Sequence, residues 1–160
     1  MSDPSIDAAV DALQTRYVRA LDRRNMQAWL DCFARDGGGY VCIAQENEQQ
    51  GLPLALMMDD SRERLMDRVK FITEVWSGTF EDYSTRHFVQ RLECVEASPG
   101  LYSVESNFMV TYTTAGRQSE ILVSGSYEDR VAIGPEGPRF TYKKAVLDTI
   151  TTPRYLVYPV

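Results

Sequence analysis

The only histidine of this chain, His87, is the side chain best suited to acid–base chemistry at neutral pH. An imidazole beside a carboxylate can act as a general acid or base. Asp22 and Asp31 lie in earlier segments with helical periodicity, so either carboxylate could reach His87 from a covering helix. A histidine at this place can also be satisfied by the backbone or by a partner subunit. The residues alone leave both interpretations open.

The number and spacing of histidines, cysteines and glycines also restrict which metal sites and nucleophilic sites this chain could form. One histidine cannot supply the ligands of a Rieske centre, a facial triad or a histidine-rich zinc site. Cys32, Cys42 and Cys94 lack C-x-x-C spacing and are expected to be reduced, packed thiols. The glycines at 37–39 precede no Lys-Ser/Thr pair, so they predict a helix stop rather than a phosphate loop. We therefore expect no catalytic and no metal-binding residues in this chain.

Composition and net charge predict the number of domains and limit the kinds of partner. The 160 residues are 44% apolar and 25% charged, which is typical of one globular domain covering residues 1–160. A net charge of −6 disfavours nucleic acid as a partner. No apolar run reaches the ~20 residues of a membrane span, and the start lacks the features of a signal peptide. We expect a cytoplasmic protein without a membrane partner.

Apolar residues at helical spacing predict three helices in the first half of the chain. The first carries its stripe from Ile6 to Leu21, with Asp3 as its cap. The second follows Asn25 after a tight corner and ends at residues 36–39. The third begins at a capping-box pattern formed by Asp60 and Glu63 and ends near residue 77. Residues 40–44 predict a short strand, residues 45–51 are polar, and residues 52–58 form an apolar arm or loop.

The period changes from 3.6 to 2 after residue 85, which indicates a sheet. Turn signals divide it into four strands near residues 85–96, 101–114, 117–132 and 139–152. Strands of this length curl, and Gly125 is a plausible bend. The expected fold is α+β, with three N-terminal helices packed in the concave face of a strongly curved antiparallel sheet, as in a cone.

Other charged and apolar residues suggest packing or contact rather than catalysis. Asp148 near Lys143, Lys144 and Arg130 favours a charge pair on a strand face. The arm at 52–58 and the apolar ending at 155–160 each favour either core cover or a subunit contact.

Several segments, in order, resemble those of a known family. The matching segments are residues 29–33, Glu46-Asn47, residues 50–54, residues 67–69, residues 83–87, residues 124–127 and residues 158–160. Together with the order of helices and strands, they resemble the small (beta) subunit of bacterial Rieske non-haem iron aromatic-ring-hydroxylating dioxygenases. That family has the nuclear-transport-factor-2-like, or SnoaL-like, cone. The likeness covers about residues 8–160, and it is greatest to the small subunits of salicylate hydroxylases and terephthalate dioxygenases.

The resemblance implies a structural subunit of an oxidoreductase that acts on a single-ring aromatic acid. The Rieske iron-sulfur cluster and the mononuclear iron would lie in a partner alpha subunit, and the beta chains would form a trimer, commonly within a hetero-hexamer of three alpha and three beta chains. Our candidates for subunit contacts are Leu52, Leu54, Met57, Arg86, His87, Tyr155, Leu156 and Tyr158. The alternative is a stand-alone isomerase, dehydratase or cyclase of the same fold, in which His87 and a carboxylate transfer protons.

Overall fold

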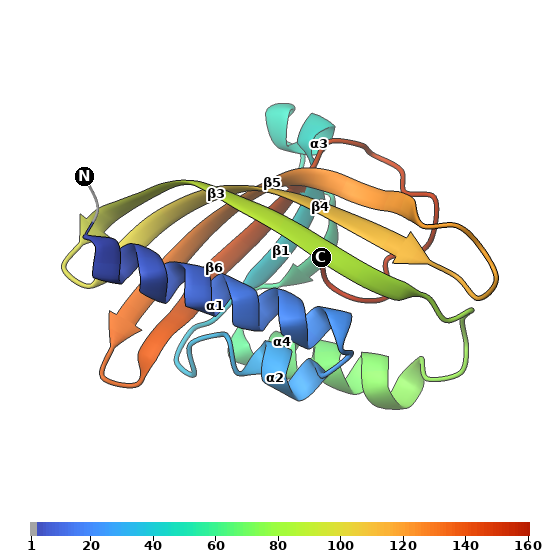
Figure 1. Ribbon diagram of the computed structural model, residues 1–160, viewed down its shortest axis with the longest axis horizontal. Coiled ribbons are helices and arrows are strands. Elements are labelled where there is room, and N and C mark those ends of the chain that lie inside the picture. Colours follow the sequence, from blue (N-terminus) through green and yellow to red (C-terminus); the bar gives the residue numbers. More distant parts are fainter. Residues whose placement is uncertain (1–2) are drawn as a thin grey trace.

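Figure 1 shows the computed structural model, which describes residues 3–160. The helix α1 (Pro4–Asp22) begins where the side chain of Asp3 accepts a hydrogen bond from the backbone of Ser5. Its predicted apolar stripe is confirmed, because the residues from Val10 to Leu21 on this stripe are buried. Arg24 then takes a left-handed backbone conformation, with φ of 59°, and makes the predicted corner.

The helix α2 (Met26–Leu30) is shorter than the sequence predicts. It ends before Phe33, which instead forms an isolated bridge to Phe140 in the sheet. The side chain of Asn25 caps the helix by accepting from the backbone of Ala28. The glycines at 37–39 therefore follow an irregular segment rather than ending the helix directly.

Two elements differ from the predicted polar segment and arm. Residues 45–51 contain a helix, α3 (Gln45–Gln49), which buries no side chain and has no side-chain cap. The arm at 52–58 is not all loop, because Ala55–Asp59 forms the strand β2, paired antiparallel with β1 (Tyr40–Ala44). Met57 points into the core, whereas Leu54 is 61% exposed. About half of the arm is therefore a strand, held in the sheet by pairing with the buried strand β1.

The third predicted helix is α4 (Arg62–Lys70), which continues as the π-helix η1 (Phe71–Val75). Its cap is Ser61, whose hydroxyl accepts from the backbone of Arg64, rather than Asp60. Arg68 makes a two-pronged ion pair with Asp59 and so ties α4 to β2. None of the helices within residues 3–160 is both long and apolar enough to cross a bilayer.

The long strands are β3 (Ser84–Ser98), β4 (Leu101–Thr113), β5 (Glu120–Gly134) and β6 (Gly137–Leu147). The sheet has the order β2-β1-β6-β5-β4-β3, and every pair is antiparallel except β1 with β6. The predicted meander is confirmed, although β5 starts three residues late and β6 stops five residues early relative to 117 and 152.

Glycine is required at residue 125 because the neighbouring strand leaves no room for a Cβ atom, and not only because the strand bends there. It pairs with both Phe108 and Leu147, and a Cβ placed on it would lie 2.0 Å from the carbonyl oxygen of Val146. A side chain at this position would force β5 and β6 apart.

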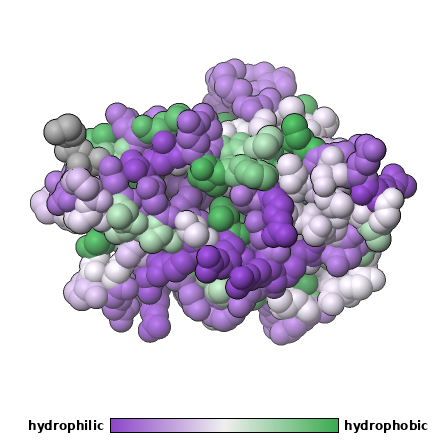
Figure 2. All heavy atoms as spheres, in the orientation of Figure 1, coloured by the Kyte–Doolittle hydropathy of each residue, from purple (hydrophilic) through white to green (hydrophobic). Residues whose placement is uncertain are grey.

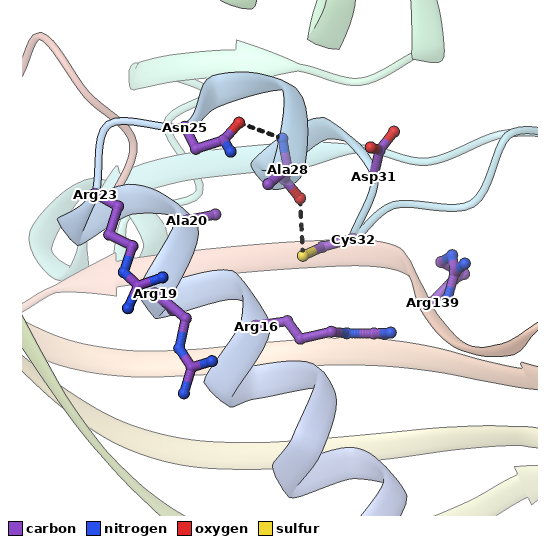
Figure 3. Close-up of a pocket in the computed structure, with 9 residues that line it drawn as sticks. All are labelled: Arg16, Arg19, Ala20, Arg23, Asn25, Ala28, Asp31, Cys32 and Arg139. Carbon is purple, nitrogen blue, oxygen red and sulfur yellow. Dashed lines mark hydrogen bonds between the residues drawn. The ribbon is translucent and has the colours of Figure 1, made fainter.

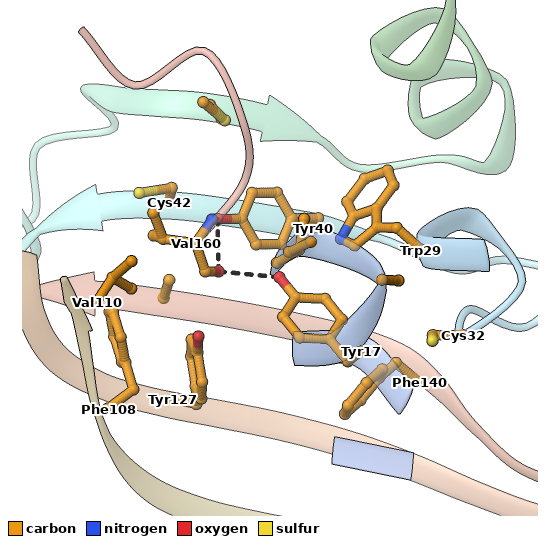
Figure 4. Close-up of a cluster of buried hydrophobic side chains, with 14 of the residues drawn as sticks. Tyr17, Trp29, Cys32, Tyr40, Cys42, Phe108, Val110, Tyr127, Phe140 and Val160 are labelled. Carbon is orange, nitrogen blue, oxygen red and sulfur yellow. Dashed lines mark hydrogen bonds between the residues drawn. The ribbon is translucent and has the colours of Figure 1, made fainter. Parts of the chain in front are cut away.

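The helices α1, α2 and α4 cover one face of the sheet, with α1 lying across β3 and β6 (Figure 1). The core between these layers is aromatic, with Tyr17, Trp29, Tyr40, Tyr127 and Phe140 fully buried (Figure 4). Phe108 stacks on Tyr127 at a centroid distance of 4.1 Å. The expected α+β architecture is therefore confirmed.

Candidate functional site

The structure brings His87 of β3 against Asp22 at the end of α1. The Nδ1 atom of His87 lies 2.6 Å from Oδ1 of Asp22, and the two side chains are 1% and 13% exposed. The same carboxylate accepts from the hydroxyl of Thr85 at 3.0 Å and from the backbone of His87 at 3.2 Å. Asp31, the other predicted carboxylate, accepts instead from Gln27 on its own helix.

Burial alone raises the pKa of Asp22, but the bonds from His87 and Thr85 and the charge of His87 outweigh it. The pKa of Asp22 therefore lies below its ordinary value. Because Asp22 holds Nδ1, Nε2 is the remaining ring nitrogen, and its role as donor or acceptor depends on the tautomer. That atom is buried and has no hydrogen-bond partner among residues 3–160. The pair has the geometry of an oriented base, and it also ties α1 to β3.

A second buried polar pair lies deeper in the core. Nζ of Lys143 donates to Oδ2 of Asp129 at 2.9 Å and to Oε1 of Gln14 at 3.1 Å. The ammonium group also lies over the rings of Tyr17, Tyr127 and Phe140, within 4.6 Å of each centroid. Burial raises the pKa of Asp129 and lowers that of Lys143, and their mutual attraction opposes both shifts.

This pair corrects the predicted group around Asp148. Lys143 is buried with Asp129, and Lys144 pairs outside with Glu48 and Glu128. Asp148 accepts from the hydroxyl of Ser124. The sequence alone did not indicate Asp129 as the partner of Lys143. A bulge between Arg130 and Val131 shifts the register of β5 against β6. Counting residues back from the turn between these two strands therefore does not place Asp129 opposite Lys143.

The last residues of the chain occupy the same interior. The hydroxyl of Tyr17 donates to the carbonyl oxygen of Val160 at 2.9 Å, and that of Tyr40 does so at 3.1 Å. The backbone N–H of Val160 donates to the Tyr40 hydroxyl at 3.0 Å (Figure 4). Of the apolar ending, Val160 thus belongs to the chain's own core, and Leu156 and Tyr158 pack against that core.

The predicted contact residues divide into three groups: buried, exposed and half-buried. The side chains of Met57 and His87 are inside the molecule. Leu52, Leu54 and Arg86 are exposed, Tyr155 is 90% exposed, and Leu156 and Tyr158 are half-buried.

Further exposed apolar side chains were not predicted; on the edge strand β3 the outer face shows the same alternation as a covered one. They are Phe88, Leu92 and Val95 on β3, Met66, Phe71 and Val75 along α4 and η1, Ile121 on β5, and Ile150. Leu56 and Met58 of β2, which belong to the predicted arm at 52–58, are exposed as well. In Figure 2, apolar side chains gather near the middle of the face shown, between hydrophilic regions.

The interior residues do not fit an iron centre. Among residues 3–160, no group of three or more His, Cys, Asp or Glu side chains is placed to hold a metal ion. The three cysteines are free and buried, and burial raises the pKa of Cys42 to about 12. A Rieske cluster takes two histidines and two cysteines, and the sequence has one histidine.

A mostly antiparallel six-stranded sheet covered by helices is the α+β architecture of nuclear-transport-factor-2-like proteins, which are among the structural neighbours of this chain. Within that class, the family model described as "Ring hydroxylating beta subunit" matches residues 16–154. The chain belongs to this family, the small subunits of aromatic-ring-hydroxylating dioxygenases. The predicted resemblance is thereby confirmed, and a dioxygenase component is supported over a stand-alone enzyme.

Individual relatives agree with the family. The chain is 29% identical over 148 residues to the anthranilate 1,2-dioxygenase small subunit of Burkholderia cepacia, covering 92% of this chain and 90% of that one. It is 23% identical over 151 residues to the beta 2 subunit of the terminal oxygenase component of terephthalate 1,2-dioxygenase from Comamonas sp, covering 94% and 96%. The beta subunit of benzoate 1,2-dioxygenase from Burkholderia mallei shares the fold, with a TM-score of 0.72, 24% identity and coverage of 92% and 91%.

Proposed function

We propose that this chain is the structural small subunit of a multicomponent oxygenase that hydroxylates a single-ring aromatic acid. Its partner would be an alpha subunit that holds the Rieske iron-sulfur cluster and the mononuclear iron. The observation that carries the proposal is the family match over residues 16–154, combined with a residue set that does not fit iron. The aromatic-acid substrate is supported by the names of the relatives, which act on anthranilate, terephthalate and benzoate.

The interior supports a scaffold role. Aromatic side chains, the Lys143–Asp129 pair and Val160 pack the space beneath the helices. Asp22 and His87 connect the first helix to the edge strand of the sheet. In this role the pair acts by stabilising the layer arrangement, and the iron chemistry takes place in the partner.

The exposed apolar side chains supply surface for assembly. We infer that the edges β2 and β3, with Leu52, Leu54 and Arg86, and the segment with Tyr155, Leu156 and Tyr158 contact other subunits. Permanent contacts of this kind bury more than ~1,000 Å² each. The assembly would be a beta trimer within a hexamer of three alpha and three beta chains, each beta chain one domain over residues 1–160, in the cytoplasm.

Affinity purification of the tagged chain from its native host tests the proposal. We expect a large subunit to co-purify, and native mass spectrometry should give equal numbers of the two chains in multiples of three. Recovery of the tagged chain alone, as a monomer, from cells that express an oxygenase large subunit would contradict the proposal.

A further inference from the structure

A basic groove lies between α1, α2 and the start of β6, with a volume of about 330 Å³ (Figure 3). Arg16, Arg19 and Arg23 stand along one side of α1, and Arg139 of β6 lies at the far end. Spacings of three and four residues place the first three on one face of the helix. Four arginines therefore line one concave site on a chain whose net charge is −6.

The floor of the groove is small and apolar. Ala20, Ala28 and Cys32 line it, and the thiol of Cys32 points to the carbonyl oxygen of Ala28 at 3.4 Å. Burial raises the pKa of Cys32 to about 11, against the opposing charges of Arg16 and Arg139, so the thiol is neutral near pH 7. A flat apolar group can lie on this floor without meeting a charge.

The positive charge of the groove is not balanced from within. Its one carboxylate, Asp31, accepts from Gln27. Among residues 3–160, none of the four arginines forms an ion pair, whereas Arg24, Arg68 and Arg91 each pair with an aspartate.

Two of the like charges are held together. Arg16 and Arg139 both donate to the carbonyl oxygen of Pro138, at 3.0 and 2.9 Å. The carbonyl oxygen has two lone pairs and accepts both bonds, and an anion bound between the two guanidinium groups would offset their mutual repulsion.

We propose that this groove binds a small aromatic carboxylate, with its ring on the floor of Ala20, Ala28 and Cys32 and its carboxylate among the arginines. Arginine suits this ligand because its planar group forms forked bonds to carboxylates and stacks on rings. Ligand pockets range from about 300 to 1,000 Å³, so the volume matches a single-ring compound. The inference concerns binding by this chain itself and does not depend on the proposed assembly.

Calorimetric titration of the full chain with benzoate, benzamide and inorganic phosphate tests this inference. Benzoate should bind saturably, with an affinity that falls as sodium chloride is added. Benzamide lacks the charge and phosphate lacks the ring, so each should bind at least about tenfold more weakly. Equal binding of phosphate and benzoate would overturn the aromatic assignment.

Two variants locate the site. Arg19→Gln combined with Arg23→Gln removes two exposed charges and should weaken benzoate binding at least about tenfold. Ala28→Leu keeps the charges but fills the floor, so it should weaken benzoate binding and leave phosphate binding unchanged. Arg117→Gln, in the exposed turn between β4 and β5, is the matched control and should bind as the unaltered chain does. Thermal unfolding verifies that each variant is folded.

Benzoate binding that survives both groove variants would overturn the proposal. So would a chain that shows no benzoate binding and whose arginine variant loses only its affinity for the large subunit. That result would make the groove a contact for acidic residues of a partner protein.

Discussion

The imidazole of His87 and the carboxylate of Asp22 meet at 2.6 Å, although 65 residues separate them in the sequence. This bond connects the last residue of α1 to the edge strand β3. The backbone N–H of His87 adds a second bond to the same carboxylate, so the strand is held at a defined position against the helix.

Replacing Asp22 with asparagine should destabilise the chain by about 1–3 kcal/mol near neutral pH, because the substitution weakens a buried, charge-assisted contact. The pKa of Asp22 is lowered in the folded chain, so its contribution is complete above its ordinary value of 3.8. That contribution is lost as the pH falls through the lower folded value. Urea unfolding of both chains between pH 7 and pH 2 should show a difference that shrinks only below about pH 4. A difference that grows on acidification would contradict this account.

Removing one partner of the Lys143–Asp129 pair should strongly lower the free energy of unfolding. Lys143→Met leaves a buried carboxylate without its cation, which costs about 3–5 kcal/mol. The double variant Lys143→Met with Asp129→Leu removes both charges and should be less destabilised than Lys143→Met alone. Denaturant unfolding of the single and double variants measures this coupling. A double variant that loses as much as the sum of the single losses would show that the pair is not coupled.

Gly125→Ala should destabilise the chain by about 1–3 kcal/mol, because the added methyl group meets the carbonyl oxygen of Val146. Gly134→Ala is the control, since a Cβ at residue 134 meets no atom within 4 Å. Its effect should stay within about 0.5 kcal/mol. Thermal unfolding of the two variants compares them directly, and equal melting temperatures would refute the close-approach argument.

Arg86→Ala should weaken binding to the large subunit at least about tenfold and leave the melting temperature of the isolated chain unchanged. Arg86 is exposed on the edge strand β3, so its removal disturbs no internal packing. Arg117→Ala, at another exposed arginine, is the control. Native mass spectrometry of mixtures with the large subunit provides the measurement, and an undiminished complex with the Arg86 variant would remove this residue from the interface.

Much of the fold follows from apolar periodicity. The stripe ending at Leu21 and the alternation of β4 each match a buried face. Periodicity fails at α3, because Gln45–Gln49 buries no side chain and therefore carries no apolar stripe. It also fails at β2, where Pro53 and exposed leucines resemble a loop until β1 supplies a partner.

The candidate site was predictable in part. Residue types indicated a carboxylate on the covering helices near His87, and the helix ending at residue 22 selected Asp22 over Asp31. The partner of Lys143 was not predictable, because one bulge in β5 decides which residue faces it. The arginine groove was missed as well, since Arg139 joins the α1 arginines only through the tertiary fold.

In the function that we propose, this chain contributes structure to an oxygenase whose iron lies in another subunit. Oxidation of single-ring aromatic acids should be assayed with the purified chain alone, with the large subunit alone, and with both, each with an electron supply and an iron measurement. We expect iron in the large subunit and the complex, no iron in this chain, and turnover that requires the large subunit and is greatest for the complex. Turnover of an organic substrate at an enzymatic rate by this chain alone would contradict this proposal.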